Sequence, residues 1–221
     1  MKVYRCKAVK EIESFYGELL YRIDLFQHIS EHLNELVETM WEGLQNGVPV
    51  LLEEISNYHP SHLGKSNIEL AKAAFTKVDC KLTIANEYSF SDWEMIEALG
   101  KTKYNLYFEN AINTLLKGDL LALKMQLSKY PDIVTCRSQY GHHATLLHYI
   151  ASNGVEMWRQ KVPYNLPEIT KFLLILGANP AAKMKIYGEE CDVKSLLSSS
   201  AHPFDAGIGE ELLQLLESNS P

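Results

Sequence analysis

The chain has 221 residues, of which 46% are hydrophobic and 22% charged, and its formal net charge is −7. This composition is ordinary for a globular protein, and the acidic balance argues against the concentrated positive charge that nucleic acids and anionic membranes attract. No run of about 20 apolar residues could span a membrane, no signal peptide is evident, and four scattered cysteines without a Cys-x-x-Cys pair indicate free thiols. We therefore expect a cytoplasmic protein that binds neither nucleic acid nor membrane.

Residues 1–103 are expected to form an N-terminal helical region. Apolar side chains between residues 19 and 44 recur at intervals of three and four, which is the spacing of one helix face. The run 8–45 is too long for one ordinary helix, so it predicts two, with a break placed at Ser30. The adjacent Glu53 and Glu54 are interpreted as part of a solvated face.

An internal similarity links this region to the next. The segment "WEGLQNGVPVLLEEISNYHP" (41–60) aligns without a gap to "INTLLKGDLLALKMQLSKYP" (112–131). Each copy predicts a helix, a turn at a glycine (Gly47 or Gly118), a second helix, and a proline that ends it. A shared helix-hairpin unit is the simplest explanation.

The stretch "ATLLHYIASNG" (144–154) predicts a short helix. Thr145 is a good N-cap, because its hydroxyl can accept a hydrogen bond from an unpaired amide of the first turn. Gly154 ends the segment. His148 lies one turn after Thr145 and can hydrogen-bond back to the cap or across to the next unit, which makes a structural role the preferred interpretation.

The segment "NLPEITKFLLILGAN" (165–179) predicts a second helix, with clear residues for its start and its end. Asn165 is the expected N-cap, Pro167 lies in the first turn, and Gly177 is the expected left-handed C-cap. Ile169 and Leu173, with Phe172 and Leu176, form the expected buried face.

These two stretches together resemble the ankyrin repeat, whose first helix opens with Thr-Pro-Leu-His and whose second ends in Leu-x-x-Gly-Ala-Asp. Here "TLLH" (145–148) and "EITKFLLILGAN" (168–179) match both halves, with Leu146 in place of the proline and Asn179 in place of the aspartate. The segments "LTIANEYSFSDWEMIEAL" (82–99) and "HATLLHY" narrow the resemblance to a group of uncharacterised bacterial ankyrin-repeat proteins. The resemblance implies a helical solenoid with a binding role and no known ligand.

The expected fold is therefore all-α. An ankyrin-like repeat domain over residues 104–221 would contain about three helix pairs, the last formed by 192–200 and 210–218, and a short β-hairpin is possible at 179–190. Stacked repeats present an extended face with projecting loops that suits another protein's surface. We therefore expect a non-enzymatic protein-interaction module without a cofactor.

An insertion separates the two helices of the central repeat. Thr145 and Glu168 are 23 residues apart, against about 12 in an unbroken repeat. The extra segment, 155–165, contains tryptophan, arginine and tyrosine, which dominate interface hot spots. It is either a binding loop or a segment that folds back over its own helices. The first interpretation predicts an aromatic, mildly basic surface patch made of Trp158, Arg159, Gln160 and Tyr164, with Gln139, Tyr140, His142, His143 and Tyr187 from adjoining turns.

Other interpretations remain open. Cys136, His142, His143 and His148 could hold zinc or supply a nucleophile and base, but their spacing fits no familiar zinc pattern, and closeness in sequence proves no geometry. An enzyme or metal-binding protein that uses segment 136–148 is thus one alternative, although we expect no metal. A structural or regulatory subunit that self-associates is another.

Overall fold

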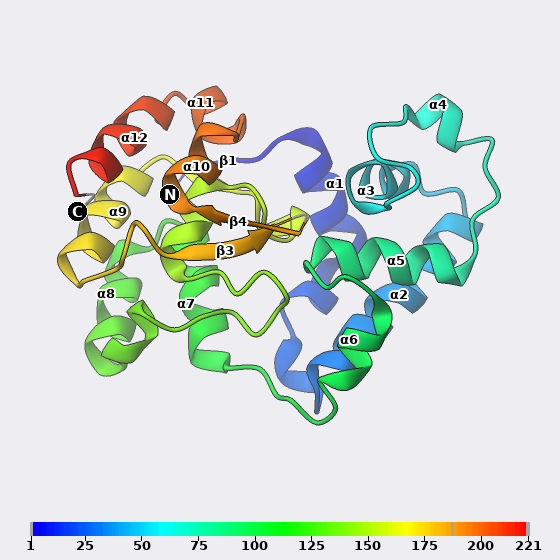
Figure 1. Ribbon diagram of the computed structural model, residues 1–221, viewed down its shortest axis with the longest axis horizontal. Coiled ribbons are helices and arrows are strands. Elements are labelled where there is room, and N and C mark those ends of the chain that lie inside the picture. Colours follow the sequence, from blue (N-terminus) through cyan, green and yellow to red (C-terminus); the bar gives the residue numbers. More distant parts are fainter. Residues whose placement is uncertain (1, 187, 220–221) are drawn as a thin grey trace. The chain divides into compact units, whose positions relative to one another are not determined.

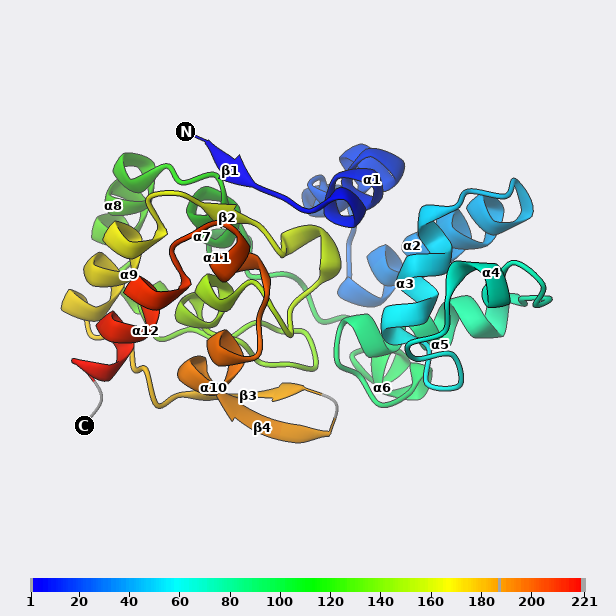
Figure 2. The same cartoon turned by 90° about the horizontal axis from the view of Figure 1, so that it is seen from above.

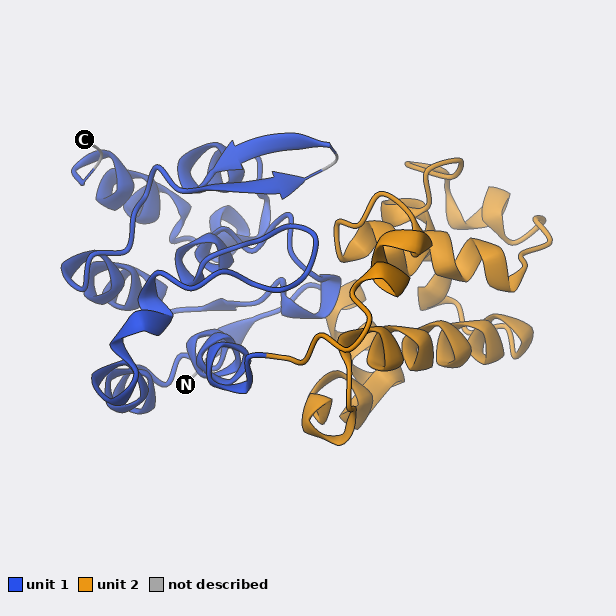
Figure 3. Ribbon diagram, turned by 60° about the horizontal axis from the view of Figure 1, so that its bottom comes forward, with its two compact units in different colours: residues 1–6, 105–221 blue, residues 7–104 orange. Residues whose placement is uncertain are grey.

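The computed structural model describes residues 2–186 and 188–219 and is mostly helical. The chain forms two compact units, which Figure 3 shows in different colours. The N-terminal unit comprises residues 7–104, and the C-terminal unit comprises 105–221 together with 1–6. The boundary predicted from the sequence lay after residue 103, and that prediction assigned residues 1–6 to the N-terminal region. No helix among the described residues is both long and apolar enough to cross a membrane.

The N-terminal unit consists of helices only, coloured from blue to green in Figure 1. Its elements are α1 (Lys7–Tyr16), η1 (Gly17–Leu20), η2 (Ile23–Leu25), α2 (Ile29–Gln45), α3 (Val50–Tyr58), α4 (Asn67–Leu70), α5 (Lys77–Glu87) and α6 (Trp93–Ala98), where η denotes a 3₁₀ helix. The run 8–45 thus holds two α-helices, as predicted, but residues 17–28 separate them rather than a single break at Ser30.

The core of the N-terminal unit includes the apolar helix face that the sequence predicted. Ile29, Leu33, Leu36 and Met40 of α2 are all buried, because side chains at intervals of three and four share one helix face. Helix α2 contacts α5, and α5 in turn contacts α3. Three neighbouring helices therefore enclose this core.

The C-terminal unit combines helix pairs with two short antiparallel ribbons. Its elements are β1 (Val3–Tyr4), α7 (Leu106–Leu116), α8 (Leu120–Lys129), η3 (Pro131–Val134), η4 (Leu146–Ala151), η5 (Met157–Arg159), β2 (Val162–Pro163), α9 (Leu166–Ile175), β3 (Lys183–Ile186), β4 (Glu189–Asp192), α10 (Val193–Ser198), α11 (His202–Asp205) and α12 (Gly209–Glu217). The hairpin of β3 and β4 confirms the expectation for 179–190. The pairing of β1 with β2 was not predicted, since it joins residues far apart in the chain.

The helices of this unit lie in two rows. The first row is α7, η4 and α10, in which each member contacts the next. The second is α8, α9 and α12, which follow one another in Figure 2. Each member of the first row contacts its partner in the second: α7 with α8, η4 with α9, and α10 with α12. The core lies between the rows.

The internal similarity corresponds to two similar helix hairpins. In both copies a helix ends, a glycine with positive φ makes the turn, and a second helix follows (α2 to α3, and α7 to α8). The angle φ is +71° at Gly47 and +73° at Gly118, in the left-handed region that glycine enters without steric cost. The predicted hairpin unit is therefore present in each structural unit.

Three local predictions need correction. Residues 146–151 form a 3₁₀ helix that ends at Ser152, whose φ is +52°, before Gly154 is reached. In α9, Leu176 was expected on the buried face but is 42% exposed. The side chain of Asn165 precedes α9 without capping it, and its Nδ2 donates to the carbonyl of Gly118 at 2.9 Å.

Candidate functional site

His148 connects two neighbouring elements of the C-terminal unit through both ring nitrogens. Its Nδ1 accepts from the backbone amide of Thr145 at 3.0 Å and lies 2.8 Å from the Thr145 hydroxyl. Its Nε2 lies 3.0 Å from the carbonyl of Ala182, just before β3. Because Nδ1 accepts, the proton is on Nε2, which donates to that carbonyl. Burial lowers the pKa of His148 to about 4, so the ring is neutral near pH 7. Both hydrogen bonds that the sequence suggested for His148, back to the cap and across to the next element, are present.

The insertion lies in the core rather than on the surface. Trp158 is 3% exposed and Arg159 is fully buried, so the interpretation of these two residues as an exposed binding loop is corrected. The physical reason is charge: a buried guanidinium is stable only with acidic partners. Arg159 has two, Glu109 of α7 at 2.6 Å and Glu156 at 3.0 Å.

The same cluster accounts for two further members of the expected patch. Tyr140 and His142 are also buried, and His142 Nε2 lies 3.8 Å from Glu156 Oε1. His142 Nδ1 accepts from the amide of Ala144 at 3.0 Å. The guanidinium of Arg159 lies over the Trp158 ring at 4.5 Å. Four residues that were expected at a surface are therefore buried, and Arg159 is the centre of an ion-pair cluster with Glu109 and Glu156.

The pKa shifts within this cluster follow from burial and charge. Burial alone would lower the pKa of Arg159, but Glu109 and Glu156 raise it well above its ordinary value. Burial would raise the pKa of Glu156, but the charge of Arg159 lowers it. At Glu109 burial outweighs the attraction of Arg159, and the pKa is raised. The Arg159–Glu156 pair is therefore the firmly ionised part of the cluster.

The remaining expected residues lie in different places. Gln139 and Gln160 are half-buried: Gln139 Oε1 accepts from the amide of Asn105 at 2.6 Å, and Gln160 Nε2 donates to the carbonyl of Val155. Tyr164 is 38% exposed, and the Lys2 ammonium lies 5.0 Å from its ring centroid. His143 is exposed. Tyr187 lies outside the described residues.

Two loops of the C-terminal unit join to form one exposed surface around His143. Arg137 Nη1 donates to the carbonyl of His143 at 2.8 Å and to that of Lys183 on β3 at 2.7 Å. The amide of Lys185 donates to the carbonyl of His142 at 2.9 Å. We call the exposed residues Arg137, His143, Lys183 and Lys185 the loop face.

The charges of the loop face are only partly neutralised. Lys183 Nζ lies 3.9 Å from Glu190 Oε2 across the hairpin. Within the described ranges, no carboxylate lies within ion-pair distance of Arg137 or Lys185. Burial lowers the pKa of His143, the hydrogen bond to the Ser138 carbonyl raises it, and the positive charges of Lys185 and Arg137 lower it further. The loop face therefore presents exposed cationic side chains, with Glu190 opposite Lys185 on the paired strand.

Sequence reasoning missed the acidic residues that hold the cluster together. Glu109 lies between Phe108 and Ile112 on an otherwise apolar helix face, and an isolated carboxyl at such a position was the available signal. Glu156 and Arg159 are three residues apart within the insertion. Arg137, Lys183 and Lys185 of the loop face were also missed, because only the folded chain brings their loops together.

The thiol and metal alternatives find no matching geometry. Among the described side chains, no group of three or more His, Cys, Asp or Glu could hold a metal ion. His142 and His148 each use Nδ1 to accept a backbone amide. All four cysteines are free, and burial raises the pKa of Cys136, whereas a nucleophilic thiol needs a lowered one.

Comparison of the chain with protein-family models, with curated proteins and with solved structures finds no match.

Proposed function

We propose that the protein is a non-enzymatic, cytoplasmic protein-interaction module of the ankyrin-repeat type. Two rows of helices, with each pair followed by a loop, are the arrangement that ankyrin repeats would produce, and such arrays present their loops to partners. The loops before η4 and before α10 are those that form the loop face. The partner would be another protein.

The observation that carries the proposal is the cluster of exposed cationic side chains on the loop face, Arg137, Lys183 and Lys185. Surface charges of this kind contribute little to stability, since even paired ones contribute about 0–1 kcal/mol. Such a cation can instead attract and orient an acidic partner. Lys185 offers the cleaner test, because the Arg137 guanidinium also links the two loops.

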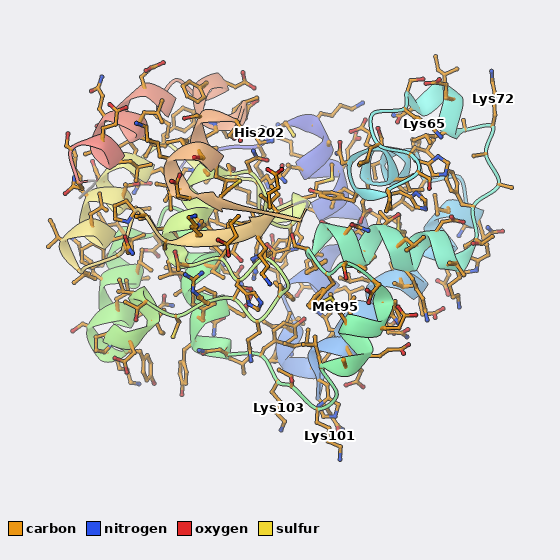
Figure 4. All side chains as sticks on the ribbon, viewed as in Figure 1. Lys65, Lys72, Met95, Lys101, Lys103 and His202 are labelled. Atoms are coloured by element: carbon orange, nitrogen blue, oxygen red, sulfur yellow. The ribbon has the colours of Figure 1, made fainter. Side chains whose placement is uncertain are left out.

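The test is capture of partners by the full-length protein from a lysate of its native host, quantified by mass spectrometry. Replacing Lys185 with glutamate (Lys185→Glu) reverses one charge of the loop face and is expected to reduce capture of a specific partner by about tenfold or more. The control is Lys72→Glu, because Lys72 is exposed, lies after α4 in the other unit, and projects away from the ribbon in Figure 4.

Two results would contradict the proposal. Equal capture by wild type and Lys185→Glu would exclude the loop face as the binding surface. Failure of the wild-type protein to capture any partner above the level of an unrelated protein would argue against an interaction module altogether.

A further inference from the structure

Large apolar side chains are exposed on the second row of helices in the C-terminal unit. Helices α8, α9 and α12 follow one another along one side of this unit in Figure 1 and Figure 2. Leu121 and Met125, four residues apart on α8, are 72% and 68% exposed, and Ile175 at the end of α9 is 83% exposed. Single exposed apolar residues are common, but several on adjoining helices are typical of an interaction surface.

Helices α8 and α9, which carry these residues, lie side by side. Just before the two helices begin, Asn165 Nδ2 donates to the carbonyl of Gly118 at 2.9 Å. About two turns further along both helices, the Lys124 ammonium lies 5.5 Å from the ring centroid of Phe172. The two helices therefore run parallel, and their exposed sides form one continuous surface.

The charge of this surface changes sign from one helix to the next. The charged residues of α8 are two exposed lysines, Lys124 and Lys129, whereas those of α12 are three exposed glutamates, the first of which is Glu210. Helix α9 lies between them and carries one acidic and one basic residue. The surface is therefore positive at one side, apolar and neutral in the middle, and negative at the other side.

The positive and negative sides are matched in height along the helices. Glu211 of α12 forms an ion pair with Lys171 of α9 at 3.6 Å. Since Lys171 directly precedes Phe172, which contacts Lys124, the residues Lys124 and Glu210 lie at about the same level on opposite sides of α9. Within residues 2–186 and 188–219, neither Lys124 nor Glu210 has an ion-pair partner.

This pattern is complementary to itself. When two such surfaces meet about a two-fold axis along α9, the α8 of each copy lies against the α12 of the other, and Lys124 faces Glu210 of the second copy. Ile175 then lies near the axis and meets the same residue of the second copy, as in any isologous contact. An axis across the helices would instead place α8 against α8, where like charges repel.

We propose that the exposed side of α8, α9 and α12 is a self-association surface that takes a second copy of this chain, with the α8 of each copy against the α12 of the other. Burial of the apolar side chains drives this association, and the charges fix its orientation. The surface shares no residue with the loop face, so it is independent of the partner proposed above. Helices of nine or ten residues give a small contact area, which is typical of weak and reversible association.

The first test is sedimentation equilibrium of the full-length chain at total concentrations of about 10–500 µM, a range that detects weak dimers. Wild type should shift from monomer toward dimer as the concentration rises. Ile175→Glu places two like charges at the centre of the contact and should weaken the association by about tenfold or more. The matched control is Ile68→Glu, because Ile68 is 76% exposed on α4 of the other unit, and it should associate as wild type does.

The second test exchanges the charges of the surface. Lys124→Glu and Glu210→Lys should each weaken the association of the single variant, because like charges then meet at both contacts of the dimer. An equimolar mixture of the two variants should associate about tenfold or more tightly than either variant alone, since both contacts of the mixed dimer again join opposite charges. Both substituted side chains are exposed, so neither variant disturbs the core.

Three results would overturn the proposal. The first is a wild-type chain that stays monomeric over the whole concentration range. The second is equal association of wild type and Ile175→Glu, because a different surface would then join the copies. The third is a mixture of Lys124→Glu and Glu210→Lys that associates no more tightly than the separate variants, because α8 would then not lie against α12.

Discussion

The two units bury carboxyl groups in opposite ways. In the C-terminal unit, Arg159 lies between Glu109 and Glu156, with ion-pair distances of 2.6 and 3.0 Å. In the N-terminal unit, the Tyr16 hydroxyl lies 3.1 Å from both carboxyl oxygens of the fully buried Glu54. Each arrangement gives a buried carboxyl a polar partner, without which its burial would be costly.

This difference predicts which perturbation should destabilise each unit. A cluster held by a cation is sensitive to loss of that cation, because the buried Glu109 and Glu156 then lose their ion-pair partner. A buried carboxyl with a raised pKa, such as Glu54, is sensitive to pH, because it ionises as the pH rises. The comparison therefore predicts different responses of the two units to substitution and to acid or alkali.

The largest expected effect is the removal of the cation from the C-terminal unit. Arg159→Met keeps much of the apolar volume beside Trp158 but leaves Glu109 and Glu156 buried without compensation. Breaking a buried ion pair by removing one partner typically costs about 3–5 kcal/mol. Hydrogen exchange read by mass spectrometry, on peptides from 105–175, should show this loss, while peptides from the N-terminal unit stay unchanged.

A triple variant provides the control for charge. Arg159→Met combined with Glu109→Gln and Glu156→Gln removes all the charges of the cluster, and replacing a whole buried ionic group with neutral residues is often tolerated. The triple variant should therefore recover much of the lost stability. If Arg159→Met alone is as stable as wild type, the contrast between the two units is wrong.

An intermediate loss of stability is expected on substitution of His148. Its pH dependence can be compared with that of the N-terminal unit. His148→Ala removes the acceptor for the Thr145 amide and the donor for the Ala182 carbonyl, so at pH 7 it should destabilise the C-terminal unit by about 1–3 kcal/mol. Denaturant unfolding of wild type and variant at a series of pH values measures this difference.

The pH dependence at His148 has the opposite sign to that of Glu54, whose pKa burial raises. Burial lowers the pKa of His148 from 6.5 to about 4, so its stabilisation is complete above pH 6.5 and is lost as the pH falls from 6.5 to 4. The wild-type and His148→Ala profiles should therefore converge across this window. A difference that stays constant down to about pH 4 would mean that His148 is not held in its neutral form.

The sequence predicted what local periodicity encodes and missed what depends on distant partners. The stripe on α2, the glycine turns at Gly47 and Gly118, and the hairpin at 179–190 follow from spacing and backbone preference alone. The burial of Arg159 depends on Glu109, fifty positions earlier in the chain. A pattern that contains tryptophan and arginine fits an interface and a compensated core equally well.

The same limit explains the wrong prediction for Glu54. Its neighbours Leu51 and Ile55 are fully buried, and a carboxyl between them could have signalled an interior site. Adjacent glutamates are nevertheless most often solvated, because a buried carboxyl needs a partner. Its hydrogen-bonding partner, the Tyr16 hydroxyl, is uncharged, so no charge complementarity in the sequence pointed to it.

The smallest expected effect concerns the Tyr16 hydroxyl, which is the hydrogen-bonding partner of the buried Glu54. Tyr16→Phe deletes the donor to Glu54 and should destabilise the N-terminal unit by about 1 kcal/mol at neutral pH. Because this hydrogen bond lowers the pKa of Glu54, its loss should raise that pKa further. A bond to a carboxylate is stronger than one to a neutral carboxyl, so the cost of Tyr16→Phe should grow as the pH rises and Glu54 ionises. Hydrogen exchange of peptides from 50–58 and 77–87, corrected for the intrinsic pH dependence of exchange, measures that cost. A cost that is the same at about pH 6 and about pH 9 would mean that Glu54 does not change its charge in this range, and the two units would then differ only in the geometry of their buried carboxyl groups.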